Sequence, residues 1–324
     1  MRGAMGLGAP LSIRPIFTGG TGRSGTTITG YLIGSHPEIW NTEPIEIRFL
    51  TDKGGLLDTA FVAESAMKRR GRKQKANDVL DRALRRYTPP NEAMLRDFLL
   101  KMRGHWYLRH GVGDHLCRGL HKSIALADLE RALVNFESAF ATEPAAAGAS
   151  LLHELFDPRA EQKGATAWVD TTPHNAIRSR RVSELMPDAK IVHMIRDGRD
   201  AGMSVMSMAW GPKDPLAALE WWRWRVLQSH QAMTAIPAEQ SHTIVFEELV
   251  STNRDETMER LFAFLGYDVV PQVRDYFNNK MPAGRAHVQR WRSDVPAAML
   301  AEFERTYAEM HEQLTSEGVP LPPL

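Results

Sequence analysis

The stretch Gly19-Gly20-Thr21-Gly22-Arg23-Ser24-Gly25-Thr26-Thr27 decides the fold of this chain. An apolar run over 15–18 comes before it and predicts a strand, and the pattern over 28–33 predicts a helix. A glycine-rich turn between a strand and a helix directs backbone N–H groups and the helix N-terminus toward one point, where they can bind a phosphate. The sequence therefore predicts a phosphate-binding loop.

Gly20 and Gly25 stand five positions apart, which is the glycine spacing of a P-loop. A P-loop for a nucleoside triphosphate continues with Lys and then Ser or Thr, whereas this chain has Thr26 and Thr27. The lysine that contacts the β- and γ-phosphates is missing, and a cation stands earlier in the loop, at Arg23. This exchange argues against a nucleoside triphosphate as the ligand.

The composition limits the class of protein. The chain has 324 residues, of which 43% are hydrophobic and 24% charged, enough for one large domain or two smaller ones. Its formal net charge of +1 gives no general attraction to nucleic acid. The single cysteine, Cys117, excludes an internal disulfide and a Cys-rich metal site, and we expect a cytoplasmic protein. No apolar run reaches the roughly 18 residues that a membrane span needs.

Strand and helix patterns alternate on either side of a less regular middle. The strand patterns that follow the loop lie at 39–40, 167–170, 190–195 and 243–246. Such alternation predicts an α/β fold of the P-loop type, in which helices flank both faces of a parallel sheet. We expect one domain over 1–324, with a loose tail over 1–12. In the helix predicted over 215–235, Trp221 and Trp224 share one face, and we expect them in the core.

The middle of the chain, 51–164, has a polar and largely helical pattern, which we interpret as a helical insertion or cap. Within it, residues 65–86 carry nine lysines or arginines against two aspartates. Such a run is either a solvated helix face or a surface that binds an anionic partner, and both interpretations stay open here.

Two further polar groups follow strands, and ligands of parallel sheets bind beyond the carboxyl ends of the strands. One is the turn at 171–173, where we expect the adjacent His174 to be structural. The other is Arg196. Ser204 comes eight residues after Arg196, about 9 Å along a helix that starts near Gly198. An arginine and a serine held in this way can both bind one phosphate, from two sides, so the sequence predicts a second phosphate site.

These motifs together resemble those of sulfotransferases that use 3′-phosphoadenosine 5′-phosphosulfate. Residues 22–27 resemble the family's 5′-phosphosulfate loop in its arginine form, which is typical of the carbohydrate, tyrosyl-protein and bacterial branches. Residues 195–200 with Ser204 resemble its 3′-phosphate motif. The resemblance covers roughly 14–50 and 165–295, and the two phosphate motifs in this order make it specific.

The resemblance implies an enzyme that moves a sulfuryl group to a hydroxyl or amine of a carbohydrate, lipid or other small-molecule acceptor. Adenosine 3′,5′-bisphosphate would be the second product, and neither a metal ion nor nucleic acid would take part. The acceptor, which can be a glycan, would bind against 51–164. The residues to which the resemblance assigns donor binding are Gly22, Arg23, Ser24, Gly25, Thr26, Thr27, Arg196, Ser204, Arg290 and Trp291. Arg23 would also act in catalysis, between the 5′-phosphate and the sulfate.

The reaction also needs a base that accepts the proton of the acceptor hydroxyl. Glu43 is the first candidate, because it leaves the second strand beside the loop and stands in a Glu-Pro pair like that of carbohydrate sulfotransferases. Glu46 is the second candidate. Glu43 has an alternative role as the N-cap of a helix that begins near Pro44.

Two other functions remain open. Asp197 follows a buried strand, as the Mg²⁺-binding aspartate of a P-loop kinase or NTPase does, although the triphosphate lysine is missing. The chain could instead be a non-catalytic nucleotide-binding protein on the same scaffold. Dependence on Mg²⁺ would identify the kinase, and turnover of the sulfuryl donor would identify the transferase.

Overall fold

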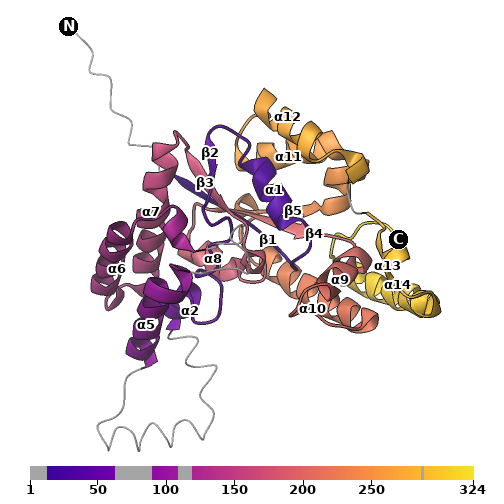
Figure 1. Ribbon diagram of the computed structural model, residues 1–324, viewed down its shortest axis with the longest axis horizontal. Helices are drawn as coiled ribbons and strands as arrows, with labels where there is room; N and C mark the ends of the chain where they lie inside the picture. Colours follow the sequence, from indigo (N-terminus) through magenta and orange to yellow (C-terminus); the bar gives the residue numbers. More distant parts are fainter. Residues whose placement is uncertain (1–12, 63–89, 109–118, 286–287) are drawn as a thin grey trace, which may run out of the picture.

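The structure is a computed structural model of the chain, and it describes residues 13–62, 90–108, 119–285 and 288–324. The predicted tail over 1–12 and the basic segment over 65–86 lie outside the described residues. Figure 1 shows a central sheet with helices on both sides, which confirms the predicted α/β fold.

One five-stranded parallel sheet runs through the molecule in the order β2-β3-β1-β4-β5. Its strands are β1 (Arg14–Gly20), β2 (Ile39–Asn41), β3 (Ala167–Asp170), β4 (Lys190–Ile195) and β5 (Ser241–Val245). The central strand is β1, which pairs with β3 on one side and β4 on the other. The predicted loop therefore begins where the direction of strand addition changes, the position at which such sheets bind ligands.

The strands are apolar on both sides because helices cover both faces of the sheet. Successive side chains alternate between two cores, so that Phe17 and Trp168 face one core while Ile16 and Val169 face the other. All four side chains are fully buried. This double burial holds β1 rigidly, and with it the start of the loop.

Three groups of helices surround the sheet (Figure 1). The helices on the side of Ile16 are α1 (Thr26–Ile33), α11 (Arg254–Leu265) and α12 (Pro271–Lys280). Those on the side of Phe17 are α2 (Leu56–Ala60), α5 (Pro90–Lys101), α6 (Leu126–Phe140), α7 (Pro144–Gln162) and α8 (Ser179–Leu185). A third core joins α9 (Gly198–Met206), α10 (Pro215–Thr234), α13 (Trp291–Asp294) and α14 (Leu300–Ser316). Shorter helical turns lie at Met102–Trp106, Leu120–Lys122, Pro173–Asn175, Ala238–Gln240, Glu248–Thr252, Ala283–Arg285 and Ala297–Met299.

The described part of 51–164 contains α2, α5, α6 and α7. Its apolar side chains pack into the same core as Phe17 and Trp168. Trp168 also donates a hydrogen bond through Nε1 to Oδ1 of Asp157 in α7, at 2.9 Å. These helices are therefore attached to the sheet at β3.

The tryptophans of α10 are placed differently from our expectation. Trp222 is the fully buried one and packs in the third core, where its ring centroid lies 5.6 Å from that of Tyr307. Trp221 is half-buried, and Trp224 is 55% exposed. The helical period predicts which side chains share a face, but the packing of α10 on α9 and α14 decides which face turns inward.

Candidate active site

The loop between β1 and α1 has the backbone geometry of a phosphate-binding turn. Gly22, Arg23 and Gly25 have positive φ angles of 86°, 62° and 91°. A Cβ at Gly25 would lie 2.5 Å from the Phe246 ring, so only glycine fits there. No side chain caps the first turn of α1, which leaves its first backbone N–H groups for an anion.

The side chains of the loop point in different directions. Arg23 is exposed and Thr27 is half-buried, whereas Ser24 and Thr26 are buried. The hydroxyl of Ser24 has no hydrogen-bond partner among the described residues. Thr18 donates a hydrogen bond through its hydroxyl to the carbonyl of Thr26 at 3.2 Å, which fixes the first residue of α1 against β1.

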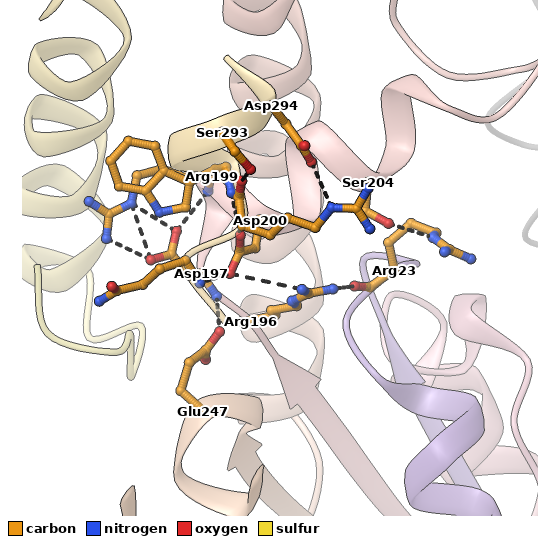
Figure 2. Close-up of polar contacts among 12 residues, drawn as sticks. Arg23, Arg196, Asp197, Arg199, Asp200, Ser204, Glu247, Ser293 and Asp294 are labelled. Carbon is orange, nitrogen blue, oxygen red and sulfur yellow. Dashed lines mark hydrogen bonds and ion pairs between the residues drawn. The ribbon is translucent and has the colours of Figure 1, made fainter. Parts of the chain in front are cut away.

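The two predicted phosphate motifs meet at Arg23. Nε of Arg23 donates to the hydroxyl of Ser204 in α9 at 2.9 Å. Nη1 of Arg196, the residue after β4, donates to the backbone carbonyl of Arg23 at 3.0 Å. Figure 2 shows the Arg196 side chain between Arg23 and Asp200. The structure thus brings together three residues that the sequence assigned to two separate phosphates.

Arg196 is held in place from several sides. It is 9% exposed, and its guanidinium lies 5.1 Å from the centroid of the Phe246 ring and 3.9 Å from Oδ2 of Asp200. Burial lowers the pKa of Arg196, and the carboxylates of Asp200, Glu247 and Asp197 oppose that effect. The protein therefore presents a buried cation at the end of β4, in a fixed orientation.

Asp200 is a site residue that the sequence reasoning missed. Its carboxylate accepts hydrogen bonds from the backbone N–H groups of Gln289 at 2.7 Å and Trp291 at 3.0 Å. It therefore joins Arg196 to the segment that contains Arg290. The available signal was its position four residues after Arg196, one helical turn away.

Asp197 serves a structural purpose at the start of α9. It caps the helix by accepting from the backbone N–H of Arg199 at 2.8 Å, and it pairs with the Arg199 guanidinium at 2.6 Å. The Arg199 guanidinium in turn lies between the rings of Trp291 and Tyr307, at 4.5 and 4.4 Å from their centroids. Both carboxylate oxygens of Asp197 are therefore engaged by arginine, which does not fit the Mg²⁺-binding aspartate of a kinase.

Glu247, at the end of β5, was also missed. One oxygen accepts from the backbone N–H of Asp197 at 3.1 Å, and the other has no hydrogen-bond partner among the described residues. Burial raises the pKa of Glu247 to about 7, although the N–H of Asp197 and the charge of Arg196 act in the opposite direction. Figure 2 shows this carboxylate beneath the start of α9.

Arg290 and Trp291 have different surroundings. Arg290 has a 59% exposed side chain and pairs through Nε with Oδ2 of Asp294 at 3.1 Å. Trp291 is fully buried in the third core and packs against Phe303, with ring centroids 6.1 Å apart. Its ring presents no surface to an adenosine, so our expectation of a direct contact does not fit this placement. The ring instead supports Arg199.

Asp170, at the end of β3, connects the Glu43–Glu46 segment to the sheet. Its fully buried carboxylate accepts from the backbone N–H of Ile47 at 2.9 Å, the hydroxyl of Thr172 at 2.9 Å and the side-chain amide of Asn175 at 2.7 Å. Burial raises its pKa to about 6, against the effect of these hydrogen bonds. The sequence pattern predicts only the end of a strand and a turn here.

The two candidate bases stand beside β3. Glu43 is exposed, and its carboxylate has no hydrogen-bond or ion-pair partner among the described residues. No helix begins at Pro44, so the alternative role of Glu43 as an N-cap is wrong. Glu46 is half-buried and lies 3.8 Å from Arg48. The carbonyl of Ile45 accepts from the N–H of Thr171 at 2.8 Å, which holds the segment at the carboxyl edge.

Within the described ranges, no group of three or more His, Cys, Asp or Glu side chains is arranged to hold a metal ion. In the same ranges, no helix combines the length and the apolar character that crossing a membrane requires.

No curated protein matches the chain. Among solved structures, the sulfotransferase domain of the Synechococcus PCC 7002 olefin synthase matches with 16% identity and a TM-score of 0.46, covering 93% of this chain and 95% of that one. The sulfotransferase domain from the curacin biosynthetic pathway matches with 14% identity and a TM-score of 0.48, covering 97% and 100%. Sulfotransferase STF9 from Mycobacterium avium matches with 16% identity and a TM-score of 0.45, covering 94% and 77%.

A family model gives the decisive result, because it matches residues 15–272 and is described as the sulfotransferase family. This range includes both phosphate motifs, with Arg23, Arg196 and Ser204. The chain is therefore an enzyme that belongs to the sulfotransferase family.

Proposed function

We propose that this enzyme transfers a sulfuryl group from 3′-phosphoadenosine 5′-phosphosulfate to a hydroxyl or amine of a small-molecule acceptor, such as a carbohydrate or lipid. The observation that carries the proposal is the contact between the two phosphate motifs. Arg196 donates to the carbonyl of Arg23, and Arg23 donates to Ser204. A nucleotide with one phosphate on each side of its ribose fits two anion sites that are this close.

The residues at the ends of β1 and β4 fit the donor. In this proposal the 5′-phosphate binds to the backbone N–H groups of 22–27 and to the hydroxyl of Thr27, at the uncapped start of α1. The 3′-phosphate binds to Arg196 and Ser204, with the exposed Arg290 as a second cation. Because ATP has no 3′-phosphate, these contacts would select the sulfuryl donor against ATP.

The proposed reaction is an in-line displacement at sulfur. The acceptor oxygen or nitrogen forms a bond to sulfur, the bond between sulfur and the 5′-phosphate oxygen breaks, and a base takes the acceptor proton. Arg23 and the loop N–H groups stabilise the negative charge that grows on the leaving phosphate. The scheme uses side chains and backbone groups alone, so it requires no metal ion.

Glu43 is the proposed base, with Glu46 as the second candidate. Glu43 is favoured because its carboxylate is exposed and has no partner among the described residues, whereas Glu46 has Arg48 at 3.8 Å. The acceptor would then lie between the loop and the helices of 51–164. The backbone carbonyl of Glu43 accepts a hydrogen bond from the hydroxyl of Ser123, which belongs to 51–164, so the backbone of the proposed base contacts the proposed cap.

The experiment is a calorimetric titration with adenosine 3′,5′-bisphosphate and, separately, with ADP and with ATP and Mg²⁺. We expect binding of the bisphosphate without added metal, and at least tenfold weaker binding of ADP, since it lacks the 3′-phosphate. Preference for ATP with Mg²⁺ would overturn the proposal in favour of a kinase. Binding of none of the three would indicate a scaffold that has lost its ligand.

A further inference from the structure

Arg225, near the proposed site, is a cation that has no carboxylate partner in the part of the chain that the structure describes. It lies on α10 and is half-buried. Its contact within the described ranges is with Trp221, one helical turn earlier, and the guanidinium lies 5.0 Å from the centroid of that ring. Burial lowers the pKa of Arg225. By contrast, Arg223 on the same helix pairs with Glu220 at 3.0 Å. Arg225 is thus a half-buried guanidinium that lies over an aromatic ring and leaves its charge available to an anionic ligand.

The ring beneath Arg225 adjoins the phosphate loop. Cη2 of Trp221 lies 4.0 Å from the position that a Cβ would take at Gly22. On its other side Trp221 packs against Trp210, with ring centroids 6.0 Å apart and an angle of 47° between the planes. Trp210 is 60% exposed. The two rings therefore form an open aromatic surface beside the loop that would hold the sulfuryl group.

The charge of Arg225 also acts on His174, which follows β3. The pKa of His174 is lowered by burial and next by the positive charge of Arg225. Nδ1 of His174 lies 3.9 Å from Oδ1 of Asp52, and Asp52 pairs with Arg48 at 3.2 Å. Nη1 of Arg48 in turn lies 3.8 Å from Oε2 of Glu46. A series of neighbouring groups thus leads from Gly22 of the loop through Trp221, Arg225 and His174 toward Glu46, the second candidate base.

Arg48, His174 and Arg225 differ in whether they have a carboxylate close to them. Arg48 has Asp52 and Glu46 close to it, and His174 has Asp52. Arg225 has no such neighbour within 4.0 Å among the described residues. An acceptor that carries its own anionic group would supply the missing charge, and a ring on that acceptor would stack on the tryptophans.

We propose that Trp210, Trp221 and Arg225 form an acceptor subsite for a ring-bearing molecule with an ionised carboxylate, and that Arg225 determines this specificity. The inference rests on the proposed function, because it places the acceptor between the sulfuryl loop and the candidate base. Arg225 acts as a binding residue here and takes no part in the bond changes.

The test compares two probes that differ in one charge, phenyl β-D-glucuronide and phenyl β-D-glucoside, by calorimetry on enzyme saturated with adenosine 3′,5′-bisphosphate. We expect the wild type to bind the glucuronide at least about tenfold more tightly, the contribution of one charge-assisted hydrogen bond. Arg225→Gln should remove this preference, whereas the control Arg223→Gln should keep it. Trp210→Ala should weaken both probes equally.

Equal binding of the two probes to the wild type, no binding of the glucuronide, or a preference that Arg225→Gln leaves intact would each overturn the inference. Binding of the bisphosphate to each variant shows that it is folded, and we expect that affinity to be unchanged. Failure of the bisphosphate to bind the wild type would instead contradict the proposed function. The two failures are therefore distinguishable.

Discussion

Arg23 and Ser204 are 181 positions apart in the sequence, yet Nε of Arg23 donates to the Ser204 hydroxyl at 2.9 Å. The hydrogen bond connects the loop after β1 with helix α9, which follows β4. Since Arg196 also donates to the carbonyl of Arg23, the loop is held by side chain and backbone together. Anion sites at two strand ends thereby become one surface, which is the geometric requirement for a nucleotide with two separate phosphates.

The first prediction separates the roles of these two residues. Ser204→Ala should weaken binding of adenosine 3′,5′-bisphosphate about tenfold, because it removes one hydrogen bond to a charged group. Arg23→Ala should lower the turnover of the sulfuryl donor on the order of 100-fold, because the charge on the leaving phosphate loses its side-chain cation. Calorimetry and turnover rates measure the two effects.

The control for this pair is Ser207→Ala, which alters an exposed hydroxyl three residues after Ser204, at the C-cap of α9. We expect it to change neither quantity. A normal turnover rate in Arg23→Ala would show that this arginine does not act in the transition state.

Local patterns were sufficient to predict the sheet and the loop. The run at 190–195 is buried on both sides of the sheet, and Gly22 and Gly25 are required by backbone angles that few other residues adopt. Each of these features is encoded within a few consecutive residues. The position of Arg196 at the same edge as the loop then follows from the general rule for parallel sheets.

The remaining parts of the site depend on partners distant in sequence. The Asp170 carboxylate accepts several hydrogen bonds only because the backbone N–H of Ile47 and the side-chain amide of Asn175 both reach it. The Arg199 guanidinium is held between two rings that come from α13 and α14. Likewise, no pattern within α10 states that Trp222 turns inward, since that depends on the helices that pack against it. These are consequences of tertiary packing.

The second prediction concerns Glu247 and pH. Burial raises its pKa to about 7, so that the carboxyl is neutral below that pH and negative above it. Its negative charge offsets part of the charge of Arg196. A phosphate monoester keeps its second charge above about pH 6. Binding of adenosine 3′,5′-bisphosphate should therefore tighten a few-fold as the pH falls from 8.5 to 6.8, the effect of one neighbouring charge at intermediate dielectric.

Glu247→Gln should bind the bisphosphate tightly at both pH values, because the amide cannot ionise. Glu248→Gln is the matched control, since Glu248 pairs with Arg260 at 3.2 Å instead. We expect Glu248→Gln to keep the pH dependence of the wild type. If Glu247→Gln keeps it as well, another group is responsible.

The third prediction concerns stability and Asp170. Its folded-state pKa of about 6 lies above the usual 3.8, so protonation favours the folded state. This stability is fully present below about pH 4 and is lost as the pH rises through 6, on the order of 3 kcal/mol in total. Asp170→Asn cannot titrate, and its amide nitrogen would face the donors of Ile47 or Asn175. Urea unfolding at pH 4.5 and 7.5 measures both proteins.

We expect Asp170→Asn to be less stable than the wild type at pH 4.5, by roughly 1–3 kcal/mol for the unsatisfied donors. The difference between the two proteins should shrink at pH 7.5, where the wild type must keep a buried negative charge. A difference that is the same at both pH values would show that Asp170 does not titrate in this range.

The last prediction distinguishes the two candidate bases. Glu43→Gln should leave the binding of adenosine 3′,5′-bisphosphate intact and reduce the turnover rate on the order of 100-fold or more, because general base catalysis is lost. Glu46→Gln should reduce it by less, since that carboxylate already has Arg48 close to it. A Glu43→Asp variant keeps the carboxylate on a shorter side chain and should recover part of the rate, which a purely structural role would not predict. Unchanged turnover in Glu43→Gln combined with a large loss in Glu46→Gln would assign the proton transfer to Glu46. Because Glu46 lies 3.8 Å from Arg48, and Arg48 pairs with Asp52 beside His174, that result would place the reacting hydroxyl next to this charged cluster.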